Sequence, residues 1–343
     1  MVTINKNELK EILSVLSLYG IDLDNIKIVR DTVGFVNKIY FVTAGKKRMV
    51  LRKSNPVTSL AHIKLEAKLL EYLSAHKFAA TPQIIRNLKG QDITIYNKCF
   101  FTLQNFMPGS AKASWNNLAG FTPKRVEDFF QTMARFSRAV EKFPHLNKVE
   151  NKPLGYFIKS GSALLSKLYK GLPSSAGKEL VFKNYQSILE FIANSKKEFL
   201  RTGYSSLSKQ LVHFDFHPGN VNFSGNKVVA IFDFDWARYD TRFSDLASAI
   251  LQSCYYYGGK MGGRLRKDRI GRAIANYQKA YGQSNFSKDE EKEYIKVAAK
   301  GYAIYILFWA VDLYKNDPSK GNFLVLDHFL KVLLINDYDI LFS

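Results

Sequence analysis

The segments LVHFDFHPGN, residues 211–220, and IFDFDW, residues 231–236, combine apolar residues typical of strands with closely spaced acidic, amide and histidine side chains. The first contains the pattern His-x-Asp-x-x-x-x-Asn, which places a carboxylate at Asp215 and an amide at Asn220. The second follows a short β-hairpin pattern and contains an Asp-x-Asp pair that begins at Asp233. A hairpin returns the chain on itself. We therefore expect the three polar side chains to converge on one point.

Three side chains of these types suit phosphoryl transfer. That reaction needs a carboxylate to accept or orient the proton of an acceptor hydroxyl, and metal ions to neutralise the phosphate oxygens. Asp215 supplies the carboxylate, Asn220 a neutral oxygen ligand, and Asp233 the hard anionic ligand that Mg²⁺ prefers. A plainer interpretation is that Asp215 and Asn220 stabilise a turn and Asp233 caps a strand. The position of the motif, after a β-rich segment and before a helical one, favours phosphoryl transfer.

The chain before residue 107 is predicted to form a small mixed sheet with helices beside it. Alternating apolar patterns and turn residues predict strands at 26–29, 38–43, 48–52, 92–96 and 100–106. Helical periodicity predicts helices at 7–19 and 59–75.

The chain after residue 106 is predicted to be mainly helical, with helices at 125–143, at 178–200 and from about 244 onward, and a β segment at 221–233. We therefore predict an α/β (α+β) fold of two lobes, with a small β-rich N-lobe at 1–106 and a large helical C-lobe at 107–343.

Composition narrows the class of partner. The 343 residues include 50 basic and 30 acidic side chains, which gives a net charge of +20. Such a charge favours anionic ligands, including nucleotides and nucleic acid, and disfavours a cationic substrate unless acidic residues gather around its site. Two distant cysteines argue against a disulfide framework or a structural zinc site. The absence of a signal-like start and of a long apolar run predicts a cytoplasmic protein without a membrane partner.

The two motifs resemble those of the aminoglycoside phosphotransferase / choline kinase-like family, which is related to the protein kinases and includes homoserine-kinase-like members. Residues 217–220 match the family's common His-Pro-Gly-Asn sequence. The likeness extends over nearly the whole chain and is sharpest at 211–247. It implies a protein-kinase-like fold that uses ATP and Mg²⁺. It also implies that Asp215 is the catalytic base and that Asn220 and Asp233 bind the metal.

The same resemblance assigns supporting residues around the loop. Asp235 matches a second acidic position that varies across the family. His213, which begins the motif, is expected to support the loop. Asp245 matches a buried carboxylate that braces the catalytic loop. From the residues alone, Asp245 equally fits the first turn of a helix that has Ser244 as its N-cap.

The N-lobe should bind the nucleotide phosphates. Arg52 aligns with the strand lysine that contacts the phosphates in protein kinases, and Glu66, on the next helix, is its expected partner. Lys53 is the competing candidate, because only one of two adjacent strand residues can face the cleft. Exposed basic residues and a surface glutamate are the plainer interpretation.

The purine should bind at the junction of the lobes. Backbone groups of Asn105 and Met107 are expected to contact it there, although a plain edge strand would carry the same residues. The loop expected to cover the phosphates contains one glycine, Gly34, instead of the usual set of glycines.

These observations predict an ATP- and Mg-dependent phosphotransferase that acts on a hydroxyl of a small molecule. A neutral or zwitterionic metabolite such as homoserine, an amino alcohol or a sugar is favoured, because the chain after Asp245 is poor in clustered acids. One alternative is an aminoglycoside-type antibiotic kinase. Another is a non-catalytic nucleotide-binding scaffold, suggested by Arg52 at the lysine position and by the thin glycine loop.

Nucleic acid is a less favoured partner. Its case rests on the charge of +20 and on residues 259–272, which hold six basic residues and one acidic residue. A solvated basic surface is the simpler interpretation. The oligomeric state is open.

Overall fold

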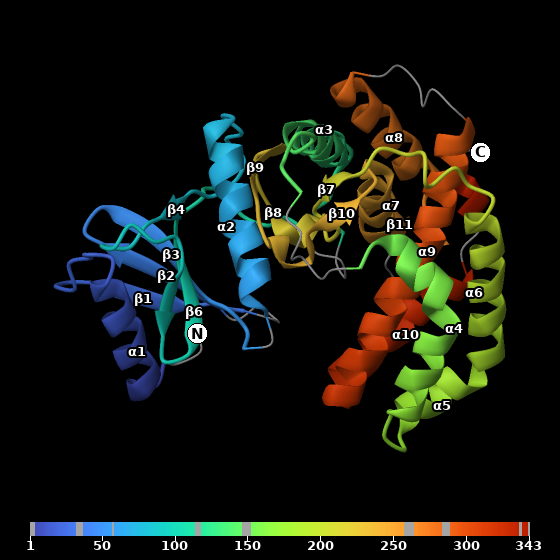
Figure 1. Ribbon diagram of the computed structural model, residues 1–343, viewed down its shortest axis with the longest axis horizontal. Coiled ribbons are helices and arrows are strands. Elements are labelled where there is room, and N and C mark those ends of the chain that lie inside the picture. Colours follow the sequence, from blue (N-terminus) through green and yellow to red (C-terminus); the bar gives the residue numbers. More distant parts are fainter. Residues whose placement is uncertain are drawn as a thin grey trace.

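The computed structural model describes residues 4–31, 37–56, 58–113, 118–145, 152–256, 264–282, 289–335 and 338–341. The predicted phosphate loop around Gly34 lies outside these described residues. The chain first forms a sheet flanked by helices and then a larger group of helices, and the two lie side by side (Figure 1).

The N-terminal sheet is antiparallel at every described pairing, so the predicted mixed sheet is wrong. The order across the sheet is β1 (Lys27–Arg30), β2 (Lys38–Ala44), β3 (Lys47–Lys53), β6 (Cys99–Asn105) and β4 (Ile84–Ile85), with β5 (Thr94–Tyr96) also paired to β6. Two of these pairs, β2 with β3 and β5 with β6, are joined by tight turns, which require the two strands to run in opposite directions. β4 has only two residues, too few to show an alternating pattern.

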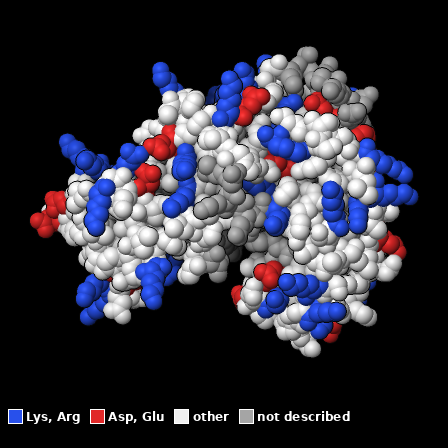
Figure 2. All heavy atoms as spheres, in the orientation of Figure 1, with Lys and Arg blue, Asp and Glu red and all other residues white. Residues whose placement is uncertain are grey.

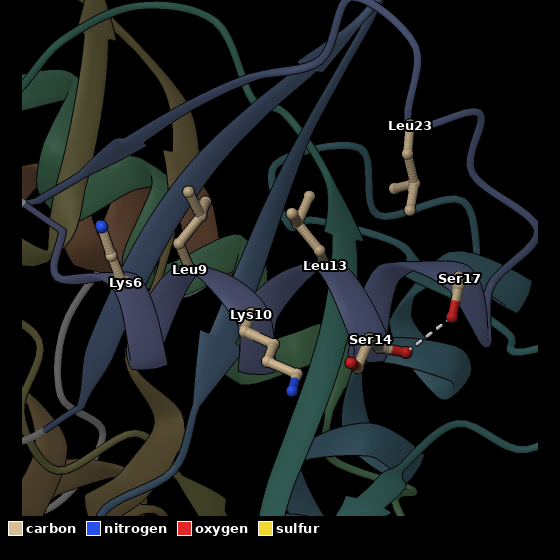
Figure 3. Close-up of a pocket in the computed structure, with 7 residues that line it drawn as sticks. All are labelled: Lys6, Leu9, Lys10, Leu13, Ser14, Ser17 and Leu23. Carbon is tan, nitrogen blue, oxygen red and sulfur yellow. Dashed lines mark hydrogen bonds between the residues drawn. The ribbon is translucent and has the colours of Figure 1, made fainter.

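Helix α1 (Lys6–Ser17) packs its apolar side chains against the sheet, where Ile12 and Leu16 are buried with Tyr40 and Leu51. Its other side carries an open groove of about 430 Å³, flanked by leucines and lysines (Figure 3). The groove contains none of the predicted site residues. Its lining residues are Lys6, Leu9, Lys10, Leu13, Ser14, Ser17 and Leu23.

Helix α2 (Leu60–Ala75) stands between the sheet and the large lobe (Figure 1). Its leucines, including Leu65 and Leu69, join the hydrophobic core of the large lobe, whereas the sheet and α1 share a separate core. A helix that packs on one lobe can therefore present a side chain such as Glu66 toward the strand of the other.

The large lobe is a group of helices around α9 (Asp289–Asn316), which contacts α4, α6, α7 and α10. Among the described residues α9 is also the helix long and apolar enough to cross a membrane, but 83% of its most apolar window is buried, as in a core helix. The other helices are α3 (Pro123–Ala139), α4 (Leu154–Lys170), α5 (Ala176–Lys183), α6 (Tyr185–Phe199), α7 (Arg242–Ser253), α8 (Lys267–Tyr281) and α10 (Lys320–Ile335).

The helices differ from the prediction in three respects. The single helix predicted at 178–200 is two helices, α5 and α6, because Asn184 turns the chain between them and its side chain bonds to the Leu180 carbonyl at 2.9 Å. α3 ends at Ala139 instead of 143. α4 was not predicted. The apolar pattern continues across both α5 and α6, so periodicity alone does not reveal the break.

Short strands hold the two motif stretches where the lobes meet (Figure 1). β7 (Gln210–Val212) pairs with β10 (Arg238–Asp240), and β8 (Val221–Ser224) forms a hairpin with β9 (Lys227–Ile231). The loop after β7 leads into β8, and the loop after β9 leads into β10. Because β7 pairs with β10 and β8 pairs with β9, the two loops lie close together. A further hairpin joins β11 (Tyr255–Tyr256) to β12 (Arg264–Leu265).

Candidate active site

The loop after β7 has a strained backbone that the large lobe holds in place. Phe214 has φ of 66°, a left-handed conformation that costs energy for a bulky residue. The carboxylate of Asp245 accepts the N–H groups of His213 at 3.1 Å and Phe214 at 2.7 Å. The guanidinium of Arg238 lies 3.5 Å above the Phe214 ring. These contacts offset the strain and fix the loop.

Asp245 is therefore placed to stabilise the backbone of the loop after β7. It is fully buried, and burial raises its pKa to about 7. The predicted cap is wrong: Thr241 is the N-cap of α7, and its hydroxyl accepts the Ser244 N–H at 3.3 Å. Two hydroxyl residues three positions apart fit a cap equally well in sequence, and the structure uses the earlier one.

His213 lies within the loop support. Its Nε2 faces the Phe232 carbonyl at 2.9 Å, and its Nδ1 accepts the Asp215 N–H at 3.3 Å. Burial lowers its pKa to about 4, so the ring is neutral at pH 7 with the proton on Nε2. The ring thus ties this loop to the loop after β9, as its predicted supporting role requires.

The carboxylate of Asp215 is held by two amides. Asn220 Nδ2 donates to Oδ2 at 3.0 Å, and Gln252 Nε2 donates to Oδ1 at 3.1 Å. Asn220 Nδ2 also donates to the Asp215 carbonyl at 3.0 Å, so the amide nitrogen must face Asp215 and the amide oxygen faces away. His217 Nε2 lies 3.6 Å from Oδ2.

Asp233 sits at the start of the loop after β9, with φ of 62°. The Phe232 N–H donates to the Asn220 carbonyl at 2.9 Å, so the two motif stretches are joined next to the predicted metal ligands. The side chain of Asp233 keeps 39% of its surface exposed, enough for a ligand to reach it. Burial of the carboxyl group and the charge of Asp235 raise the pKa of Asp233 to about 7.

Arg52 connects the N-lobe to this acidic loop. One terminal nitrogen of its guanidinium contacts Glu66, and the other lies 2.5 Å from Asp235 Oδ1 and 3.4 Å from Asp233 Oδ1. Its side chain is 8% exposed. Burial alone lowers the pKa of Arg52, but the three carboxylates outweigh it and raise the pKa. The planar fork lets one cation reach three anions, which an ammonium group cannot do in the same geometry.

Lys53 points elsewhere. Its Nζ lies 2.6 Å from Glu11 of α1, on the opposite side of the strand from Arg52, as the pleat of β3 requires. Of the two candidate cations, Arg52 is the one the structure places beside Asp233. Asp235 also accepts a hydrogen bond from Asn37 Nδ2 at 2.6 Å, so it links the loop to the N-lobe twice.

The predicted purine contacts lie at the end of β6. The Asn105 N–H already donates to the Gln83 carbonyl at 3.0 Å, and the Asn105 side chain accepts the Gln83 N–H at 2.6 Å. Of the Asn105 backbone groups, a purine ring could therefore hydrogen-bond only to the carbonyl oxygen. Met107 lies two residues after Asn105 and is 8% exposed.

Sequence reasoning missed two site residues, Asn37 and Gln252. Gln252 lies seven residues after Asp245, which places both on one face of α7, and this spacing was a usable signal. Asn37 carries no local signal, because its partner Asp235 is 198 positions away.

Comparison with known proteins gives three results. A family model described as "Phosphotransferase enzyme family" matches residues 27–293. None of the curated proteins matches the chain. Solved structures match over nearly the full length, at identities low enough to show the fold alone.

Three of these structures illustrate the likeness. An amicoumacin kinase in complex with AMP-PNP, Ca²⁺ and the ligand Ami has 16% identity, a TM-score of 0.69, and coverage of 98% of this chain and 99% of that chain. A microcompartment-associated aminopropanol kinase has 12% identity, a TM-score of 0.68 and coverage of 95% of each chain. A choline kinase from Cryptosporidium parvum has 13% identity, a TM-score of 0.61, and coverage of 94% and 95%. The protein-kinase-like two-lobe fold is thereby confirmed.

Proposed function

Since the chain belongs to the phosphotransferase enzyme family and is a small-molecule kinase, we propose that it transfers the γ-phosphoryl group of ATP to a hydroxyl of a neutral or zwitterionic metabolite. The observation that carries the proposal is the convergence of Asp215, Asn220 and Asp233 where the lobes meet. Arg52 approaches the same point from the N-lobe.

Asp215 is proposed as the base. The acceptor oxygen attacks the γ-phosphorus, the bond between that phosphorus and the bridging oxygen of ADP breaks, and ADP leaves with the electron pair. The hydroxyl proton passes to the Asp215 carboxylate, which the amides of Asn220 and Gln252 hold in place. In such reactions most of the rate enhancement comes from positioning and from charge stabilisation.

The residues present fit a magnesium ion. Asp233 offers an accessible carboxylate and Asn220 an amide oxygen turned away from Asp215, and both are hard oxygen ligands. Within the described ranges no three His, Cys, Asp or Glu side chains are arranged to hold a metal by themselves. We therefore propose that nucleotide phosphates complete the coordination. When bound, Mg²⁺ would neutralise charge on the phosphates.

The nucleotide is proposed to bind between the lobes, with Arg52 beside its phosphates and the purine at Asn105 and Met107. Arg52 carries a guanidinium that stays protonated at any working pH, because its pKa is raised. Glu66 and Asp235 fix the direction of this guanidinium. ATP-type nucleotides are present in related structures, with AMP-PNP, ADP and AMP.

The proposed acceptor class rests on the acids of the large lobe. Recognition of a cationic amine calls for an uncommitted carboxylate near the site. Of the seven acids after Asp245 whose side chains the structure describes, six lie within 4.0 Å of a basic side chain. The pairs are Asp268–Arg266, Glu291–Arg242, Glu293–Lys296, Asp312–Lys315, Asp327–Lys331 and Asp339–Lys296. This arrangement supports a neutral or zwitterionic acceptor.

An antibiotic kinase is the second candidate. Similar structures include the amicoumacin kinase and a spectinomycin phosphotransferase as well as amino-alcohol kinases. A scaffold without activity is disfavoured, because such a protein would not need the complete set of Asp215, Asn220 and Asp233. Nucleic acid is disfavoured as well. Lysines and arginines are scattered over both lobes on the face in Figure 2, with acidic residues between them.

The experiment is an acceptor panel. ADP release from MgATP is measured with homoserine, sugars, choline, ethanolamine, aminopropanol, spectinomycin and other aminoglycosides. We expect stimulation by a sugar or by homoserine that exceeds stimulation by any cationic member, whether a monocationic amino alcohol or a polycationic antibiotic. Stimulation only by cationic amines would refute the proposed acceptor class, and absence of MgATP binding would refute the kinase proposal.

A further inference from the structure

Helix α7 holds the catalytic loop at two points from a single face. Near its start, Asp245 accepts the backbone N–H groups of His213 and Phe214. Seven residues later, Gln252 donates its side-chain N–H to Asp215 Oδ1 at 3.1 Å. Positions i and i+7 lie two turns apart on the same face. One rigid helix thus fixes both the backbone of the loop and its carboxylate.

The contact between Gln252 and Asp215 restricts rotation of the Asp215 carboxylate. The torsion between the Cβ and Cγ atoms of an aspartate has broad minima, so packing of the backbone does not set the plane of the carboxylate. Asn220 Nδ2 and His217 Nε2 both lie near Oδ2 of Asp215, at 3.0 Å and 3.6 Å. Gln252 is the described residue that contacts Oδ1. Without it the carboxylate would be held at one oxygen only.

The environment of Gln252 makes this contact effective. Gln252 is 5% exposed, so water competes little for its amide. An ionised carboxylate accepts hydrogen bonds and donates none, so the amide nitrogen must face Asp215. The amide is also neutral, whereas a glutamate at this position would set a second negative charge about 3 Å from the first.

We propose that Gln252 is a positioning residue for the reaction, which fixes the plane of the Asp215 carboxylate so that a free lone pair faces the acceptor hydroxyl. This inference rests on the proposed role of Asp215 as the base. It adds a residue of α7 to the machinery of the site and gives α7 a function beyond bracing the loop backbone.

The test compares Gln252→Leu and Gln252→Glu with the wild type. Leucine keeps the volume of the side chain and removes the donor. The control is Gln186→Leu, which removes an exposed glutamine amide on α6 that bonds to Glu190 at 3.0 Å. Turnover of MgATP is measured with the best acceptor of the panel, or with water as the acceptor. Crystal structures of the wild type and of Gln252→Leu are determined in parallel.

For Gln252→Leu we expect kcat to fall about 10- to 100-fold, the range that small misplacements of a catalytic group produce. KM for MgATP should stay within about twofold, because the nucleotide site is untouched. For Gln252→Glu the acid limb of the pH–rate profile should move to higher pH, because two adjacent carboxylates share a proton. Gln186→Leu should match the wild type. The Asp215 carboxylate should be rotated in the Gln252→Leu crystal.

Two results would overturn the inference. One is an unchanged kcat in Gln252→Leu when Asp215→Asn has lost turnover. The other is an unrotated Asp215 carboxylate in the Gln252→Leu crystal, a result that needs no acceptor. Full turnover in Asp215→Asn is a different failure, because it would refute the proposed function and, with it, the role that Gln252 serves.

Discussion

Replacement of Arg52 by methionine tests the charge arrangement where the lobes meet. The substitution keeps the length and packing of the side chain but leaves Glu66, Asp233 and Asp235 without their shared cation. Loss of one partner of a buried ion pair costs about 3–5 kcal/mol, because the remaining charge stays desolvated. Glu66 and Asp235 are 8% and 13% exposed, so this range applies to them. The unfolding temperature should fall by about 4–7 °C, because an unfolding entropy of about 2.1 cal/mol/K per residue over 343 residues makes 1 kcal/mol worth about 1.4 °C.

The assay is thermal unfolding without nucleotide, followed by measurement of KM for MgATP. Arg52→Lys should lose less stability, because it keeps the charge and loses the fork. A matched control is Arg86→Met. Arg86 also pairs with two carboxylates, Glu71 and Asp92, but its side chain is 55% exposed. That variant should leave the unfolding temperature nearly unchanged.

An Arg52→Met variant that unfolds at the wild-type temperature and binds MgATP as tightly as the wild type would contradict this role of Arg52. The three carboxylates would then be stable without a cation, and the arginine would serve neither the fold nor the phosphates.

Lys53→Met should leave KM for MgATP within about twofold of wild type, because Lys53 pairs with Glu11 away from the cleft; a tenfold rise in KM would contradict the assignment of Arg52. Asp235→Asn should raise the KM for MgATP several-fold while changing kcat less, as measured by steady-state kinetics, because the variant weakens the contact that orients the Arg52 guanidinium. An unchanged KM would argue against a role for this contact. The metal-free protein should lose stability as pH rises from about 4 to 7, because the fully buried Asp245 has a folded-state pKa of about 7 and ionises near 4 when unfolded. Urea unfolding at pH 5 and pH 7 measures this loss of stability. The loss should be smaller in Asp245→Asn than in the wild type. An equal loss in the two proteins would show that Asp245 is not its source.

Much of the fold could be predicted from local patterns of apolar residues in the sequence. The hairpin of β2 and β3, helix α2 and the apolar stripe of α3 all lie within a few residues of their predicted positions. Each has a strong period of its own, alternating in the strands and close to 3.6 in the helices. The break at Asn184 was missed because it interrupts the backbone without interrupting the apolar pattern.

The site was predictable where its residues are close in sequence. Asp215 and Asn220 lie in one loop, and Asp233 follows a single hairpin, so spacing alone suggested their convergence. The choice between Arg52 and Lys53 needed the structure. Both lie on β3, and the partner that fixes Lys53, Glu11, lies 42 positions earlier.

The contacts across the lobes could not be predicted from local signals. Asn37 bonds to Asp235 across 198 positions, and Asp245 reaches back 32 positions to the His213 N–H. Such pairs depend on how whole elements pack, and a single sequence carries no trace of that packing. The register of Gln252 relative to Asp245 is the exception, because it follows from helix geometry once Asp245 is placed.

The proposed role of Asp215 is to serve phosphoryl transfer to a small-molecule hydroxyl. The most direct measurement is acceptor-stimulated ADP release with MgATP, compared between the wild type and Asp215→Asn, with MgATP binding measured in both by calorimetry. We predict that the variant binds MgATP as the wild type does and loses at least about 100-fold in stimulated release. Equal stimulated release from the two proteins would contradict this role.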